Sequence, residues 1–175
     1  MKKEAKRKLA KSSKYKEKDI KRTNKFAVFL ACIIIVYIAA GIGNIFTSGN
    51  VNSAWYQSIK PSITPPNFVF PIAWNILFLL ITCSLFFAWI NSNKKEKKKI
   101  SLLFAVNLIL NILWSFLFFF LQMPAFAFFE LILFWFSILF LVIGLWKISK
   151  ISSWLLIPYL LWVSFASILN YLSAF

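Results

Sequence analysis

The chain passes from its first apolar run to its second through Trp55–Trp74, which reads WYQSIKPSITPPNFVFPIAW. Three prolines, Pro61, Pro65 and Pro66, lie close together in this stretch. Because proline donates no backbone hydrogen bond and restricts the residue before it, the stretch cannot form an ordinary helix. Proline-rich segments are stiff, and Trp and Tyr favour the membrane interface. We therefore predict a shaped, aromatic-flanked loop that acts as a lid beside a bundle of helices.

Long apolar runs lie on both sides of this loop. The 175 residues are 61% hydrophobic and 19% aromatic, well above the roughly 45–50% apolar content of soluble domains. About 20 apolar residues suffice to cross a hydrocarbon core about 30 Å thick. Such runs occur at residues 26–46, 70–90, 100–121, 125–146 and 153–174. The sequence predicts an all-α membrane protein, a bundle of five transmembrane helices with a proline-rich first extracytoplasmic loop, over residues 26–175.

The segment before the first span, residues 1–25, is strongly basic and has no apolar periodicity. Such a composition buries too little apolar surface to fold by itself, so we predict a disordered cytoplasmic tail. An alternative is a docking segment for anionic lipid headgroups, which attract clustered Lys and Arg. The two readings are compatible.

The placement of charge predicts the orientation of the chain. Twelve of the 20 Lys and Arg precede residue 26, seven more lie at residues 94–99, 147 and 150, and Lys60 is alone between the first two spans. Five spans put all but Lys60 on one face, and cytoplasmic loops carry the Lys and Arg excess. We expect an N-terminus inside, a C-terminus outside, membrane lipid as a partner and no nucleic acid. A Lys-rich chain with no recognisable targeting peptide suggests a prokaryotic cytoplasmic membrane.

The third span carries the most informative polar pattern. Asn107, Asn111 and Ser115 recur every four residues, so they share one helix face, with Trp114 beside them. Asparagine is costly in lipid, so this face should point into the bundle. It forms either hydrogen bonds between helices or the polar wall of a ligand pocket.

The fourth and fifth spans add one acid and one aromatic stripe. Glu130 lies about two turns into the fourth span, where a carboxylate is either hydrated near the interface or paired with a buried donor. In the fifth span Pro158 should loosen the first turn. The stripe there, which serves packing or a site, consists of Tyr159, Trp162, Ala166 and Asn170.

Several kinds of chemistry lack their residues. The chain has no His, no acid pair, no Cys cluster and no glycine-rich phosphate loop, so we expect no metal site, no cofactor and no conventional catalysis. It does have eight Trp and 21 Phe together with several amides. These residues suit a mostly apolar cavity that stacks a flat ligand and orients it with a few hydrogen bonds.

Three motifs, in this order, resemble those of the TspO/MBR family, the tryptophan-rich sensory proteins and translocator proteins, also called peripheral benzodiazepine receptors. The first is Trp55–Tyr56 with Lys60–Ser62, Thr64–Pro66 and Trp74. The second is Asn107–Leu108 with Asn111, Trp114–Ser115 and Leu117–Phe119. The third is Leu155–Leu156 with Pro158–Leu160, Trp162, Phe165–Ala166 and Leu169–Asn170. The resemblance covers about residues 26–175.

The resemblance implies a five-helix bundle, often a homodimer, with a pocket under the first loop for porphyrins, other tetrapyrroles and flat heteroaromatic ligands. By position, Trp74 and Trp162 match tryptophans implicated in light-dependent tetrapyrrole breakdown, and so are the candidate catalytic residues. Without His to ligate haem iron, a metal-free porphyrin fits better than haem. The predicted ligand-binding residues are Trp55, Pro65, Pro66, Trp74, Asn107, Asn111, Trp114, Tyr159, Trp162 and Ala166.

The chain departs from the family pattern at a few positions. Ile63 stands where the family usually has Trp in the loop, and Glu130 replaces the commoner Asp. Tyr171 is followed only by Leu, Ser, Ala and Phe, so the cholesterol-recognition pattern of animal members, which needs a basic residue there, is absent.

The leading functional hypothesis is a membrane receptor or regulator that binds a porphyrin-like ligand within the bundle. The carboxylates of that ligand would stay near Lys60, the one cation expected on that side. The alternatives are a small-molecule transporter or exporter and a slow, light-dependent activity that degrades tetrapyrroles. The lack of internal repeats and of a coupling-ion site argues against transport.

Overall fold

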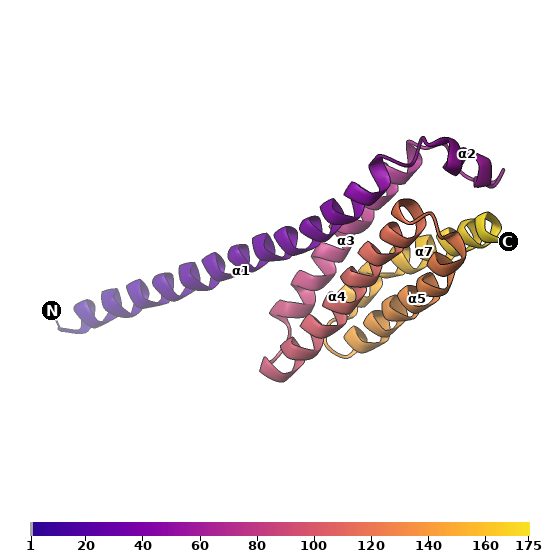
Figure 1. Cartoon of the computed structure of the whole chain (residues 1–175). Coiled ribbons are helices and arrows are strands. Elements are labelled where there is room, and N and C mark those ends of the chain that lie inside the picture. Colours follow the sequence, from indigo (N-terminus) through magenta and orange to yellow (C-terminus); the bar gives the residue numbers. More distant parts are fainter. Residues whose placement is uncertain (1) are drawn as a thin grey trace.

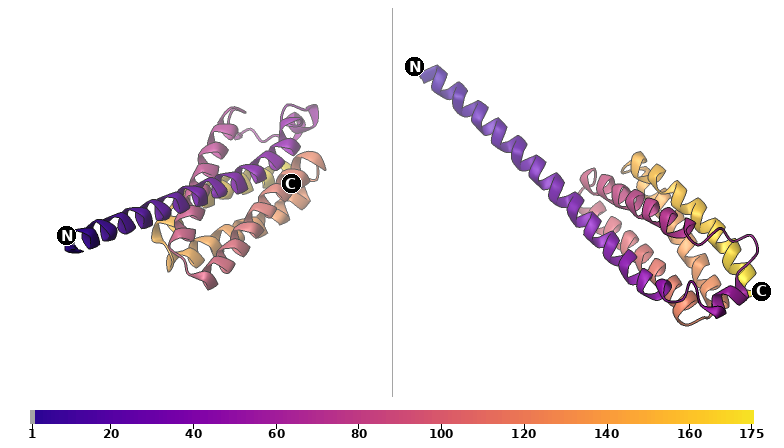
Figure 2. Two further views of the ribbon diagram at one scale, coloured as in Figure 1. Left: turned by 90° about the vertical axis from the view of Figure 1, so that its left-hand side faces the viewer. Right: turned by 90° about the horizontal axis from the view of Figure 1, so that it is seen from above.

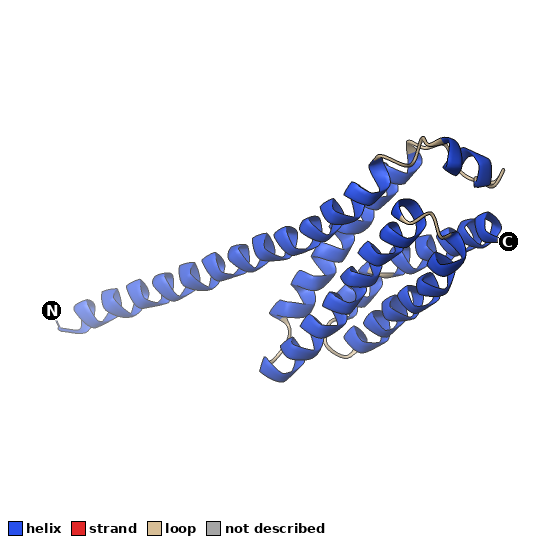
Figure 3. Ribbon diagram, viewed as in Figure 1, coloured by secondary structure: helices blue, strands red, loops and turns tan. Residues whose placement is uncertain are grey.

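The computed structural model describes the backbone of residues 2–175 and the side chains of residues 25–175, and every regular element in it is a helix (Figure 3). Five helices are long and apolar enough to cross a membrane. The predicted class, an all-α bundle of five membrane helices, is therefore confirmed. The elements are α1 (Lys2–Ser48), α2 (Ala54–Ile59), α3 (Val69–Ile90), α4 (Lys94–Ser115), the π-helical η1 (Phe116–Phe120), α5 (Pro124–Trp146), α6 (Lys150–Leu155) and α7 (Ile157–Ala174).

Helix α1 is longer than predicted at both ends. The backbone of the basic segment continues the helix from Lys2, where we expected disorder, and it extends past the bundle in Figure 1. This segment is rich in Lys, Arg, Ala and Glu, which are strong helix formers even without a packing partner. The part of α1 that can span the membrane is Lys25–Ser48. The boundary near residue 25 and the attraction of the segment to anionic lipid stay predictions.

The proline loop contains one short helix before its extended part. Ser53 caps α2, accepting a hydrogen bond from the Tyr56 N–H at 3.2 Å. The chain is irregular after Ile59, and α3 begins at Val69, so that Pro71 falls in its first turn, where the missing N–H does no harm. Tyr56 packs with Phe118, Phe119 and Ala127, and this aromatic cluster holds α2 against η1 and the start of α5.

Helices α4 and α5 form a tight hairpin. The reciprocal hydrogen bonds of Asn93 and Glu96 start α4 at Lys94, earlier than the apolar run alone predicted. At the other end, Gln122 adopts a left-handed backbone with φ of 55°. Pro124 then occupies the first turn of α5, a position that suits proline.

The predicted fifth span is broken near its start. Helix α6 ends at Leu155 and α7 begins at Ile157, with Pro158 in the first turn of α7. The N–H of Leu156 bonds to the carbonyl of Ser153. The carbonyl of Ser152 accepts a hydrogen bond from the Ser84 hydroxyl of α3 at 2.8 Å. The break thus lets a hydroxyl from another helix bond to the backbone of α6.

The helices are arranged so that α1 packs on α3 and α4, while α5 packs between α4 and α7 (Figure 2). Helix α6 fills the space between α3 and α5. The α3–α4 and α5–α6 connections, with the basic residues in and next to them, lie at one end of the bundle (Figure 1). Helix α2 and the C-terminus lie at the other end (Figure 1). The loop that we predicted as a lid therefore covers the end away from those lysines.

We predict that Ser84→Ala lowers the free energy of unfolding by about 1 kcal/mol, because the buried Ser152 carbonyl loses its bond to α3. Unfolding in detergent micelles measures the change. Ser92→Ala is the matched control, since the Ser92 hydroxyl bonds only to the carbonyl of Trp89 within its own turn. Equal losses in both variants would contradict this role of Ser84.

Candidate functional site

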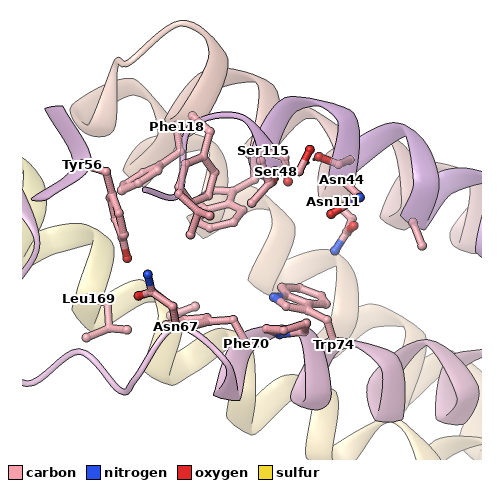
Figure 4. Close-up of a pocket in the computed structure, with 18 of the residues that line it drawn as sticks. Asn44, Ser48, Tyr56, Asn67, Phe70, Trp74, Asn111, Ser115, Phe118 and Leu169 are labelled. Carbon is pink, nitrogen blue, oxygen red and sulfur yellow. Dashed lines mark hydrogen bonds between the residues drawn. The ribbon is translucent and has the colours of Figure 1, made fainter. Parts of the chain in front are cut away.

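A cavity of about 600 Å³ opens between α1, α3, α4 and α7, beneath the proline loop (Figure 4). Its volume lies within the roughly 300–1,000 Å³ typical of small-molecule sites. Helix α1 and the loop supply Tyr37, Ala40, Gly41, Gly43, Asn44, Thr47, Ser48, Val51, Asn52, Tyr56, Pro61, Thr64 and Asn67. The other helices supply Phe70, Pro71, Trp74, Asn75, Phe78, Asn111, Trp114, Ser115, Phe118, Phe119, Ala166, Leu169, Asn170 and Ser173.

Two stacked aromatic pairs line the cavity. Trp74 stacks on Phe78 in α3, with ring centroids 5.4 Å apart and an interplanar angle of 28°. Trp114 stacks on Phe118, also at 5.4 Å, with an angle of 25°. In Figure 4, Trp74 and Phe118 lie on opposite sides of the hollow. Stacked rings on two sides suit a flat, apolar guest.

The polar groups of the cavity are uncharged. None of the described residues that line it is Asp, Glu, Lys or Arg. Asn111 is only 5% exposed, and its amide points into the hollow toward Trp74 (Figure 4). The buried hydroxyl of Thr64 has no hydrogen-bond partner among the described residues. The cavity therefore offers amides and hydroxyls to a ligand without a fixed charge.

The loop end of the cavity is also polar. The Tyr56 hydroxyl points toward Asn67 across the hollow (Figure 4). Burial raises the pKa of the Tyr56 phenol above its usual value, which keeps the group neutral and able to donate a hydrogen bond.

The polar face of α4 has both of its predicted roles, hydrogen bonding between helices and lining a pocket, each at a different residue. The buried Asn107 amide donates to Ser137 of α5 at 2.8 Å, and its carbonyl accepts from the Tyr159 hydroxyl of α7 at 3.2 Å. Asn107 and Tyr159 therefore join α4, α5 and α7 and do not line the cavity. Asn111 and Ser115, further along the same face, do line it. Asn107 links the helices, whereas Asn111, which also lies near the Tyr159 hydroxyl, lines the cavity where a ligand can reach it.

The predicted site residues separate into two groups. Trp74, Asn111, Trp114 and Ala166 line the cavity. The remaining members lie behind or beside its wall. These are Asn107, Tyr159, Trp55, Trp162, Pro65 and Pro66.

Several residues of the second group contact side chains that line the cavity. Trp162 packs edge-on against Phe70 at 6.0 Å and faces an open groove between α3 and α7 with Ala73 and Leu161. Trp55 packs edge-on against Phe118 at 5.9 Å. Pro65 and Pro66 shape the loop, while the neighbouring Pro61 and Thr64 reach the cavity. Of the stripe predicted on α7, Ala166 and Asn170 line the cavity, whereas Tyr159 and Trp162 do not.

Sequence reasoning missed the contribution of α1. The sequence analysis placed no site residue in the first span, but α1 continues to Ser48, and one face of it forms a wall of the cavity. The available signal was the recurrence of small or polar residues every three or four positions within an apolar run. These residues are Tyr37, Ala40, Gly41, Asn44, Thr47 and Ser48.

Glu130 of α5 is 7% exposed, and neither carboxylate oxygen has a hydrogen-bond partner among the described residues. We expected this acid to be either hydrated or paired, and no donor among the described residues is paired with it. Among the described residues, no group of three or more His, Cys, Asp or Glu could hold a metal ion.

Comparison with known proteins identifies relatives of the whole bundle. The model of the TspO/MBR family matches residues 30–174. The chain is 38% identical over 152 residues to the tryptophan-rich protein TspO of Chlorobaculum tepidum, which covers 85% of this chain and 95% of that protein. It is 36% identical to protein CrtK of Rhodobacter capsulatus, over 83% of this chain and 88% of that protein. The Homo sapiens translocator protein shares 29% identity, over 74% and 78% of the two chains.

Two substitutions in α4 test whether Asn107 links the helices while Asn111 lines the cavity. Asn107→Ala deprives Ser137 and Tyr159 of their shared partner, so we predict a loss of about 1–2 kcal/mol in the free energy of unfolding. Asn111→Ala, one turn further along, should cost less than Asn107→Ala, because the Asn111 side chain lines the cavity and does not bond to Ser137. Unfolding of both variants in the same detergent measures the difference, and a larger loss for Asn111→Ala would contradict the assignment.

Proposed function

The chain belongs to the TspO/MBR family, and we propose that this multi-pass membrane protein is a receptor or regulator that binds a porphyrin-like tetrapyrrole, or another flat heteroaromatic ligand, in the cavity under the proline loop. The observation that carries the proposal is the pair of aromatic stacks lining one uncharged hollow. A planar ring system gains from apolar burial and from contact with aromatic faces and edges. A compact or highly charged ligand would gain little from such walls.

Four residues contact the ligand in this proposal. Trp74 and Trp114 supply ring contacts, Asn111 bonds to a polar atom of the ligand, and Ala166 leaves space for it. Asn111 suits this role because its buried amide faces the hollow and can both donate and accept.

The other predicted residues do not contact the ligand and instead support those that do. Trp162 supports Phe70, and Trp55 supports Phe118, through the edge-on contacts of their rings. Asn107 and Tyr159 keep α4, α5 and α7 in place behind the wall. Pro65 and Pro66 hold the shape of the lid.

We further propose that the end of the bundle carrying Lys94–Lys99, Lys147 and Lys150 faces the cytoplasm, because basic residues concentrate on that side of membrane proteins. The cavity then lies near the outer face of the membrane, with the C-terminus outside. A prokaryotic cytoplasmic membrane is consistent with this orientation, and several of the similar proteins come from bacteria. Homodimer formation, implied by the family resemblance, stays a prediction.

Light-dependent breakdown of the bound ligand is a second candidate function. The observation in its favour is that two indoles, those of Trp74 and Trp114, line the cavity, where they would lie beside a photoexcited ring. Transport of the ligand has no comparable support, since the one buried acid among residues 25–175, Glu130, does not line the cavity.

Binding of protoporphyrin IX, followed by quenching of tryptophan fluorescence in detergent, tests the proposal. We expect Asn111→Ala and Trp74→Ala to raise the Kd about tenfold, because each removes a direct contact. Trp162→Ala should raise the Kd by less, since Trp162 acts through Phe70.

The control for this titration is Trp154→Ala, an exposed tryptophan in α6 at the opposite end of the bundle. Its Kd should equal that of the unmodified chain. Unchanged affinity in both Asn111→Ala and Trp74→Ala would overturn the assignment of the cavity as the binding site.

A further inference from the structure

A single cation stands at the loop end of the cavity. Lys60 is the one Lys or Arg between residues 26 and 93, and it directly follows α2. Its ammonium group donates a hydrogen bond to the side-chain carbonyl of Asn67 at 2.8 Å. It also lies 5.9 Å from the centre of the Tyr56 ring, within the range of a cation–π contact. The charge is thus held beside two residues that line the cavity.

Asn67 also bonds to the connection between α1 and α2. Its amide donates to the side-chain carbonyl of Asn52 at 3.0 Å. Lys60, Asn67 and Asn52 therefore form a chain of two side-chain hydrogen bonds, here called the latch, that joins the end of α2, the proline loop and the α1–α2 connection. Asn52 and Asn67 both line the cavity, so the latch crosses its entrance.

In the latch the ammonium group of Lys60 is bound by an uncharged acceptor, the side-chain carbonyl of Asn67. Residues 25–175 contain two acids, Glu96 and Glu130. Glu96 accepts the Asn93 N–H at the opposite end of the bundle, and the Glu130 oxygens bond to no described residue. An ammonium group binds a carboxylate more strongly than an amide oxygen. A carboxylate that reaches Lys60 can therefore displace Asn67.

We propose that the cavity is specific for flat ligands that carry a carboxylate at the ring edge, and that this carboxylate replaces Asn67 on Lys60 and so opens the latch. This inference rests on the proposed function. It adds that the ligand carries a negative charge and that this charge opens the proline loop. The ring occupies the uncharged hollow, where a carboxylate would find no cation. The carboxylate stays at the mouth, beside the cation. Once Lys60 leaves the Asn67 carbonyl, the end of α2 is no longer tied to the proline loop, and Asn67 keeps only its bond to Asn52, so the entrance widens as the ligand binds.

A comparison of two ligands tests the charge specificity. Protoporphyrin IX has two free carboxylates, and its dimethyl ester has the same ring without charge. We expect the unmodified chain to bind the acid about tenfold more tightly than the ester. Lys60→Met, which keeps the apolar stem of the side chain and removes the charge, should abolish this preference by weakening the binding of the acid. Lys60→Arg should retain the preference.

The outcomes separate this inference from the function on which it rests. If the unmodified chain binds neither ligand, the proposed function fails. If it binds both ligands but Lys60→Met keeps the full preference for the acid, the recognition of a carboxylate by Lys60 is overturned.

The latch itself is tested by the rate of association. Asn67→Ala removes both hydrogen bonds of the latch and keeps the charge of Lys60. Stopped-flow fluorescence should show association of the acid several-fold faster than in the unmodified chain. Asn91→Ala is the matched control, because Asn91 lies at the opposite end of α3 and bonds only to the Phe87 carbonyl. Equal rates in Asn67→Ala and Asn91→Ala would overturn the latch.

Discussion

The hydrogen bonds that Asn107 makes to Ser137 and Tyr159 determine where this bundle is solid and where it is hollow. Inside a membrane a polar side chain must find its partners within the protein, because hydrocarbon offers none. Asn107 finds them on α5 and α7, and α5 packs closely against both α4 and α7. Asn111, one turn further along the same face, lines the cavity between α1, α3, α4 and α7. The same residue type thus serves as a link at one position and as part of a cavity wall at the next.

The cap over the hollow depends on a different kind of contact. Tyr56 anchors the short helix α2 to Phe118 and Phe119, next to the π-helical end of α4. π-Helical turns recur at functional sites because they displace side chains from the regular helix face. Here the turn brings Phe118 and Phe119 both to the cavity and to the cap. The prolines then restrict the loop between α2 and α3, so its position depends on a few polar contacts at its ends.

The sequence predicted the helices and their class because long apolar runs and lysine-rich connections are local signals. It also predicted the inward face of α4, since costly amides repeat there at helical spacing. The placement of Trp162 was beyond it, because helical spacing puts Trp162 on the same stripe of α7 as Ala166 and Asn170 but does not define where along that stripe the cavity ends. The cavity wall on α1 was missed for a related reason. Small residues such as Gly43 indicate close packing and open space equally well until the neighbouring helices are in place.

Fluorine NMR of the chain labelled with 5-fluorotryptophan, with and without protoporphyrin IX, would locate the ligand among the eight tryptophans. A porphyrin ring current shifts only nearby nuclei, and each resonance can be assigned by a single Trp→Phe substitution. The structure predicts the largest shifts for Trp74 and Trp114, smaller ones for Trp55 and Trp162, and none for Trp146 and Trp154 at the basic end. Shifts confined to Trp146 and Trp154, or equal at all positions, would contradict a ligand site in this cavity.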